Sequence, residues 1–139
     1  MKIPFLDLQL SYLELKDGLD AAYSRVMRSG RYLLGDELEN FEQAFAKYCD
    51  TNYAVGVGNG LEALELLLRA YNIGEGDEVI VPSNTYIATW LAVSNVGAEV
   101  VPVEPDISTY NIDPKQISAA ITKKTKAIIP VHLYGQPCD

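Results

Sequence analysis

Apolar residues recur every three or four positions in the first third of the chain. One such series covers 15–26 and stops at Gly30, a residue type that commonly follows the last turn of a helix. A second series covers 38–48 and stops at the polar stretch 50–52, which is typical of a turn. The pattern therefore predicts two amphipathic helices before any strand.

Beyond residue 52, short apolar runs alternate with amphipathic stretches. We expect strands at 53–57, 78–81, 98–103 and 127–133, and helices at 61–71, 85–96 and 114–121, the last with Asp113 as N-cap. The runs at 79–81 and 127–131 are apolar at every position, which is typical of strands that helices cover on both faces. The pattern predicts an α/β fold with a mostly parallel sheet flanked by helices.

No repeat, low-complexity tract or linker interrupts this alternation, so we expect no domain boundary within residues 1–139. The chain ends at Asp139, soon after the last expected strand and before a helix that would cover it. From this pattern we expect the N-terminal portion of a larger, apparently truncated domain.

Composition narrows the class of protein. The 139 residues are 48% apolar and 22% charged, values typical of a globular chain rather than a disordered one. A net charge of −8 disfavours nucleic acid and anionic membranes as partners, because their phosphates require clustered Lys and Arg. No apolar stretch reaches the roughly 18 to 20 residues of a membrane span, and no signal peptide is visible, so we expect a cytoplasmic protein. Cys49 and Cys138 lack the spacing of a zinc site or a disulfide framework.

A glycine-rich turn precedes the helix expected at 61–71. Glycines at 56, 58 and 60 permit positive φ and close approach of a ligand, and the first amides of a helix attract anions. The turn matches neither G-x-x-x-x-G-K-[ST] nor G-x-G-x-x-G, which disfavours a dinucleotide site. From the residues alone, it is either a phosphate site or a plain connection.

The next strand-to-helix loop carries an aromatic residue, Tyr86. Parallel strands place such loops at one edge of the sheet, so a phosphate site and an aromatic ring would together suit a flat, phosphorylated cofactor. Alternatively, Tyr86 packs on the core. His132 is expected to be a hydrogen-bonded group rather than a base, and Asp106 and Asn111 to serve in turns.

Seven segments at these positions carry a family resemblance. They are PFLDL at 4–8, SGRYLLG at 29–35, GNGLEAL at 58–64, GDEVIVPSNTYIAT at 76–89, VEPD at 103–106, YNIDP at 110–114 and VHLYGQ at 131–136. The chain resembles the DegT/DnrJ/EryC1/StrS family of sugar aminotransferases, which depend on pyridoxal 5'-phosphate and belong to the fold-type I aminotransferases. Residues 1–139 would then be the N-terminal portion of the family's large domain.

The resemblance implies roles for four residues. The backbone amides of Gly60, Leu61 and Glu62 would bind the cofactor phosphate, and Tyr86 would stack on the pyridine ring. Many family members have Thr at the position of Leu61, whose hydroxyl adds a phosphate contact that this chain lacks. The loop at 31–35 would lie near the active site and the subunit interface, which implies a homodimer. No catalytic residue is expected in this chain, because the lysine that holds the cofactor and the aspartate that pairs with its ring nitrogen would follow Asp139. We therefore expect these 139 residues alone to be inactive.

The activity implied is transfer of an amino group, with glutamate as donor, to a keto group of a nucleotide-linked deoxysugar. A sugar dehydratase of the same family, with histidine in place of the lysine, is one alternative. A non-catalytic module that binds phosphate or nucleotides is another. The partners expected are a nucleotide sugar, an amino donor and a second copy of the chain, with no nucleic acid, membrane or metal.

Overall fold

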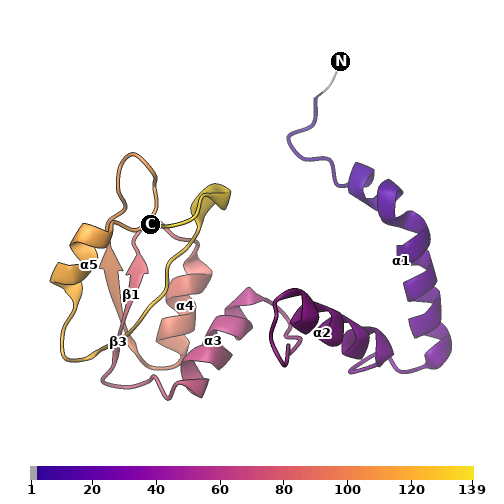
Figure 1. The fold of residues 1–139 in the computed structure, drawn as a ribbon, viewed down its shortest axis with the longest axis horizontal. Coiled ribbons are helices and arrows are strands. Elements are labelled where there is room, and N and C mark those ends of the chain that lie inside the picture. The colour runs from indigo at the N-terminus through magenta and orange to yellow at the C-terminus, as the bar shows by residue number, and fades with distance from the viewer. Residues whose placement is uncertain (1–2) are drawn as a thin grey trace. The chain divides into compact units, whose positions relative to one another are not determined.

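A computed structural model describes residues 3–139 of the chain. It contains two compact units, Met1–Gly56 and Val57–Asp139, and the boundary between them carries no linker-like composition (Figure 1).

The first unit contains the two leading helices, α1 (Gln9–Ser29) and α2 (Asp36–Tyr48). Helix α1 ends at Gly30 with φ of 68°, the left-handed conformation that glycine adopts without strain. The first turn of α2 holds three carboxylates, which the positive end of the helix dipole stabilises. Both predicted helices are present, but the first strand of the structure begins only at Glu78, after a third helix.

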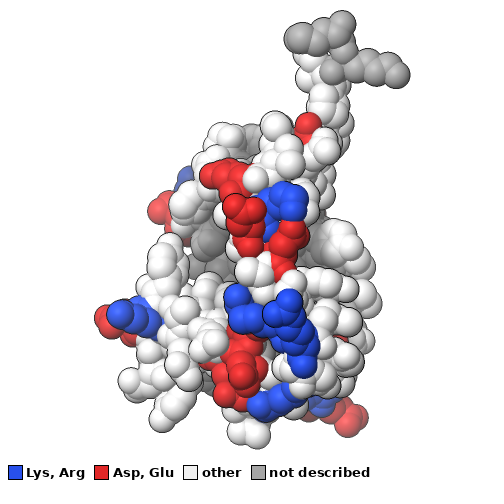
Figure 2. Space-filling view, turned by 90° about the vertical axis from the view of Figure 1, so that its right-hand side faces the viewer, with Lys and Arg blue, Asp and Glu red and all other residues white. Residues whose placement is uncertain are grey.

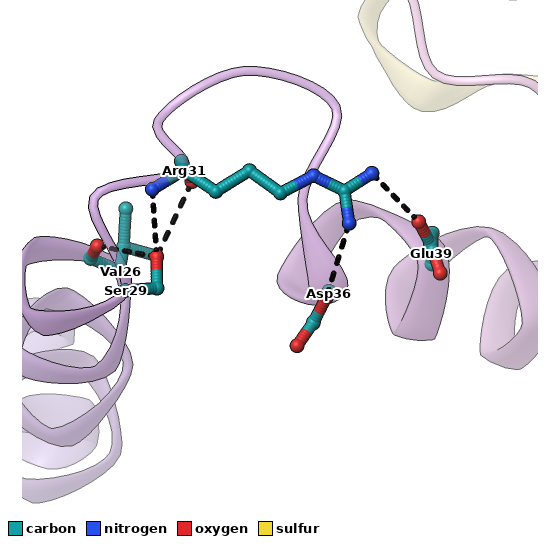
Figure 3. Close-up of polar contacts among 5 residues, drawn as sticks. All are labelled: Val26, Ser29, Arg31, Asp36 and Glu39. Carbon is teal, nitrogen blue, oxygen red and sulfur yellow. Dashed lines mark hydrogen bonds and ion pairs between the residues drawn. The ribbon is translucent and has the colours of Figure 1, made fainter.

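Exposed ion pairs join α2 to α1 and to the loop between them. Arg25 Nε lies 2.5 Å from Glu37 Oε1, and the Arg31 guanidinium lies 3.4 Å from Asp36 and 3.2 Å from Glu39 (Figure 3). The Glu37 pKa is lowered because its carboxylate accepts a hydrogen bond from Arg25. Each pair is solvated, so we expect each to contribute little to stability.

The second unit contains a parallel sheet of three strands in the order β2-β1-β3. The strands are β1 (Glu78–Pro82), β2 (Glu99–Val103) and β3 (Thr125–Ile128). In the central strand, Val79, Ile80 and Val81 are fully buried. The predicted α/β fold with a parallel sheet is confirmed.

Helices cover both faces of this sheet: α3 (Gly60–Ala70) and α4 (Ile87–Asn95) on one, and α5 (Pro114–Ala120) on the other. Val79 and Val81 pack in a cluster with residues of α3 and α4, while Ile80 packs in a second cluster that includes Ile117 of α5. Successive side chains of a strand point to opposite faces, so one continuous apolar run supplies both clusters. Helix α5 begins as predicted, with the Asp113 side chain accepting a hydrogen bond from the Lys115 amide at 2.9 Å.

The strand predicted at 53–57 is absent from the structure. Tyr53 and Val55 are 86% and 77% exposed, and the Gly56 amide donates to Glu42 Oε1 at 2.7 Å instead of to a neighbouring strand. A strand exists only where another pairs with it, and none of the three strands of the sheet does so here. The prediction was therefore wrong for this segment, although its composition suits a strand.

The strand predicted at 127–133 is shorter and begins earlier. Strand β3 ends at Ile128, and the Ile129 amide still donates to the Ile80 carbonyl at 2.9 Å. Pro130 has no N–H with which to continue the ladder. The chain then forms a short 3-10 turn, Leu133–Gly135. None of the helices in the described part of the chain is long and apolar enough to cross a membrane.

Candidate functional site: the starts of α3 and α4

The start of α3 is held by a reciprocal pair of hydrogen bonds. The N-cap residue Asn59 accepts the Glu62 amide on its side-chain oxygen at 3.0 Å. The Glu62 carboxylate in turn accepts the Gly58 amide at 2.9 Å. This arrangement is closely related to a capping box, and it fixes the path of the chain into the helix.

Two backbone amides at this helix start remain available. Among the residues that the structure describes, none accepts a hydrogen bond from the Gly60 or Leu61 amide. Apart from the adjoining residues and the backbone of α3 itself, no atom lies within 4 Å of the position that a Cβ on Gly60 would occupy. Open space, two free N–H groups and the positive end of the helix dipole together suit an anion such as phosphate.

The third amide assigned to phosphate, that of Glu62, is occupied by the Asn59 side chain. Its assignment stays a prediction, and it requires this side chain to turn away. The Glu62 carboxylate beside Gly58 also places a negative charge near the helix start, which disfavours an anion there.

The glycines of the turn matter because they lack a side chain, and not because they adopt an unusual backbone conformation. Gly56, Gly58 and Gly60 permit positive φ, but none of them adopts it in this structure. At Gly58, a Cβ would lie 2.8 Å from the Glu62 carboxylate oxygen, so a side chain there would disturb the capping contact.

Tyr86 is the N-cap residue of α4, directly after the loop that leaves β1. Its side chain is 78% exposed, so it is not a core residue in this structure. The loop around it is fixed by its neighbours: the Trp90 indole N–H donates to the Pro82 carbonyl at 3.2 Å, and the Thr85 and Thr89 hydroxyls lie 3.0 Å apart. These two contacts fix the backbone of the loop that carries the exposed Tyr86 ring.

Helices α3 and α4 lie side by side (Figure 1). Near their C-terminal ends, the Arg69 guanidinium donates to the Asn95 carbonyl at 3.2 Å, and the Asn95 side chain donates to Glu65 at 2.5 Å. Because α3 leads into β1 and α4 follows it, both helices begin toward the carboxyl edge of that strand. The glycine-rich turn and Tyr86 therefore share the sheet edge at which ligands of parallel sheets bind.

Three other residues that sequence reasoning singled out serve as structural contacts. Asp106 accepts hydrogen bonds from the Ser108 hydroxyl and amide, and these bonds hold the pKa of its carboxyl below the ordinary range. His132 Nδ1 accepts the Cys138 amide at 3.0 Å. Asn111 is buried and hydrogen-bonded through its side chain. The turn role expected of Asp106 and the hydrogen-bonded role expected of His132 are confirmed. The turn role expected of Asn111 was wrong, because its side chain bonds a distant segment that includes Gln136.

Sequence reasoning missed Asn59 and Asn84. Asn59 carries a recognisable signal, since a capping residue followed three positions later by Glu is typical of a helix start. The Asn84 side chain donates to the Tyr110 carbonyl at 3.0 Å, a contact between distant segments that no local pattern reveals.

Other features of the surface lie apart from this site. A hollow of about 590 Å³ near Tyr71, Asp77 and Lys126 lies at the opposite, amino edge of the strands. Figure 2 shows acidic and basic side chains together on the face that it draws. Cys49 and Cys138 are free thiols, and residues 3–139 contain no group of three His, Cys, Asp or Glu placed to hold a metal.

Comparison with known proteins decides the family. The model of the DegT/DnrJ/EryC1/StrS aminotransferase family matches residues 14–139. The chain belongs to this family. In agreement, it is 59% identical over 138 residues to the dTDP-3-amino-3,4,6-trideoxy-alpha-D-glucose transaminase of Streptomyces venezuelae. It is 58% identical over 137 residues to the dTDP-3-amino-3,6-dideoxy-alpha-D-galactopyranose transaminase of Aneurinibacillus thermoaerophilus. Each alignment covers 99% of this chain, but only 36% and 38% of the relatives.

Solved structures share the fold. The crystal structure of S. venezuelae DesV with a ketimine intermediate matches with a TM-score of 0.94 at 59% identity, over 99% of this chain and 37% of DesV. NtdA from Bacillus subtilis, solved with bound cofactor PMP, matches with a TM-score of 0.86 at 38% identity, over 99% of this chain and 32% of NtdA. The chain therefore spans between 32% and 38% of the length of these relatives.

Proposed function

We propose that the polypeptide carrying this sequence is a pyridoxal-phosphate-dependent aminotransferase that acts on a keto group of a nucleotide-linked deoxysugar, with glutamate as amino donor. The observation that carries the proposal is the pair of unpartnered amides at the start of α3, on the same sheet edge as the exposed ring of Tyr86. Membership of the aminotransferase family and 58–59% identity to two dTDP-sugar transaminases support it.

The residues present fit the phosphate and ring of this cofactor. The Gly60 and Leu61 amides would hold the phosphate, and Tyr86 would lie against the pyridine ring and orient it. Glu62 would add its amide only if the Asn59 side chain released it. When bound, pyridoxal phosphate supplies an electron sink for the reaction.

Chemical trapping tests this assignment. Borohydride reduction of the cofactor-loaded protein, followed by peptide mapping, locates the lysine that holds the cofactor. We expect no label on the seven lysines of this sequence, because none occupies the position that the family resemblance assigns to it. Label on a specific lysine within residues 1–139, accompanied by turnover, would refute the expectation that this segment alone is inactive.

Two alternatives make different predictions. A dehydratase of the same family would bind the cofactor but release the amine instead of retaining it in the product. A non-catalytic module would explain the glycine-rich turn, but it gives no reason for an exposed Tyr86 on the same edge. Titration with pyridoxal phosphate, NAD and nucleotides separates the module from the enzymes, since binding of nucleotides alone contradicts the proposed aminotransferase.

We also propose that the protein works as a homodimer. Helix α1 buries none of its side chains within this chain, and several are large and apolar, including Leu13, Leu15 and Leu19. Such a surface is typical of a face that another subunit covers. Sedimentation equilibrium that gave a monomer at micromolar concentration would contradict the dimer. A cytoplasmic location stays a prediction.

A further inference from the structure

Asn111 is a buried polar residue whose side chain makes hydrogen bonds to the segment 133–137. Asn111 is only 3% exposed to solvent. The Nδ2 group donates to the Gln136 carbonyl at 2.9 Å and to the Pro137 carbonyl at 3.1 Å. The Oδ1 atom accepts the Leu133 amide at 3.0 Å, an amide shared with the Val131 carbonyl. Both donors and the acceptor of the side chain are therefore used.

These bonds connect two loops on either side of the central strand. Asn111 lies in the loop after β2, where the bridge between Pro105 and Ile112 holds the backbone. Its partners lie in the segment 133–137 after β3. Because the strand order is β2-β1-β3, this connection passes across the carboxyl end of β1.

The loop that leaves β1 joins the same network. Asn84 donates from its side chain to the carbonyl of Tyr110, the residue next to Asn111. Tyr86 follows two positions after Asn84. The loops after all three strands are thus linked by two asparagine side chains, on the edge where Tyr86 is exposed.

We propose that Asn111 is a positioning residue for the cofactor site: it ties the loops after β2 and β3 together, and through Tyr110 and Asn84 it fixes the loop that presents Tyr86. This inference rests on the proposed function. Only an uncharged amide supplies two donors and one acceptor in this plane. A carboxylate would face two carbonyl oxygens. Alanine would remove the donor to the Gln136 and Pro137 carbonyls and leave the Leu133 amide with the Val131 carbonyl alone.

The test uses the polypeptide that carries this sequence, with variants Asn111→Ala, Asn84→Ala and the control Asn95→Ala. Asn95 is an exposed asparagine of the same unit, and its side chain donates to Glu65. It is the last residue of α4 and therefore lies away from the helix start that carries Tyr86. Asn84 is exposed, so its replacement preserves folding even if the Asn111 variant does not fold. Three quantities are measured: amide hydrogen exchange at 133–136 and in β1, affinity for pyridoxal phosphate, and the induced circular dichroism of the bound cofactor.

In Asn111→Ala we expect exchange at 133–136 to accelerate about tenfold, as loss of one hydrogen bond implies, while the amides of β1 stay protected. Cofactor affinity falls about tenfold, and the induced dichroism weakens because the ring is less well held. Asn84→Ala reproduces the loss of affinity and dichroism without the change at 133–136. Asn95→Ala alters none of the three.

Equal acceleration across β1 and 133–136 would overturn the inference, because it would show general destabilisation. Faster exchange at 133–136 with unchanged affinity and dichroism would also overturn it, since the loops would then be tied without serving the site. If Asn111→Ala does not fold, unchanged affinity and dichroism in Asn84→Ala overturns it. A wild-type protein that binds no pyridoxal phosphate contradicts the proposed function instead, and the exchange measurement still decides whether Asn111 ties the loops.

Discussion

Most of the polar side chains described at the carboxyl edge make hydrogen bonds within the protein and are not free to bind a ligand. The Asn59 side-chain oxygen accepts the Glu62 amide, the Asn111 side chain bonds neighbouring carbonyls and an amide, and Asp106 is bonded by Ser108. The groups left free are main-chain amides at Gly60 and Leu61 and the ring of Tyr86. In a chain of net charge −8, an anion would be held by oriented backbone dipoles rather than by Lys or Arg.

Replacement of Ser108 by alanine removes the hydroxyl that donates to Asp106, so we expect the Asp106 pKa to rise toward its ordinary value of about 3.9. The folded-state pKa is lowered, so its stabilisation is present above the ordinary pKa and lost as pH falls through the folded-state value. The variant should therefore lose less stability than the wild type below about pH 4. Titration of the Asp106 carboxyl by NMR checks this, and an unchanged pKa would contradict it.

Local signals predicted the helices closely, whereas the strands depended on distant partners. Spacing and the Gly30 stop predicted α1, and Asp113 followed by Pro114 predicted the start of α5. The segment 53–57 has strand composition but no pairing strand in this structure, and Pro130 interrupts the ladder after β3. At the glycine-rich turn, residue type indicates that positive φ is permitted but not whether it is adopted, and the structure does not use it there.

The start of α3 offers a direct stability test. We expect Asn59→Ala to lower the free energy of unfolding by about 1 kcal/mol, because the Glu62 amide loses its side-chain acceptor. Asn59→Asp retains an acceptor oxygen and should cost less than half of this. Urea denaturation followed by circular dichroism measures both. Equal stability of the wild type and Asn59→Ala would show that the cap contributes nothing.

At the scale of the whole molecule, one compact unit contains the proposed cofactor site and the other contains the helix proposed to contact a second copy. The unit Val57–Asp139 contains the sheet, the helix starts and Tyr86, and hence every residue assigned to the cofactor. The unit Met1–Gly56 contains α1, whose side chains are unburied, and it supports the proposed contact with a second copy. The family places the chain among sugar aminotransferases, while the substrate of this protein stays a proposal.

The most direct test of the central claim compares pyridoxal phosphate affinity in the wild type, Gly60→Ala and Gly60→Pro. Gly60 is the first residue of α3, where proline is well tolerated, and the preceding Asn59 is extended, as a residue before proline prefers. Both variants fill the same open space, but only proline removes the amide donor. Loss of a hydrogen bond to a charged phosphate should weaken binding about tenfold to a hundredfold in Gly60→Pro relative to Gly60→Ala. Equal affinity in these two variants would contradict a phosphate site at the start of α3.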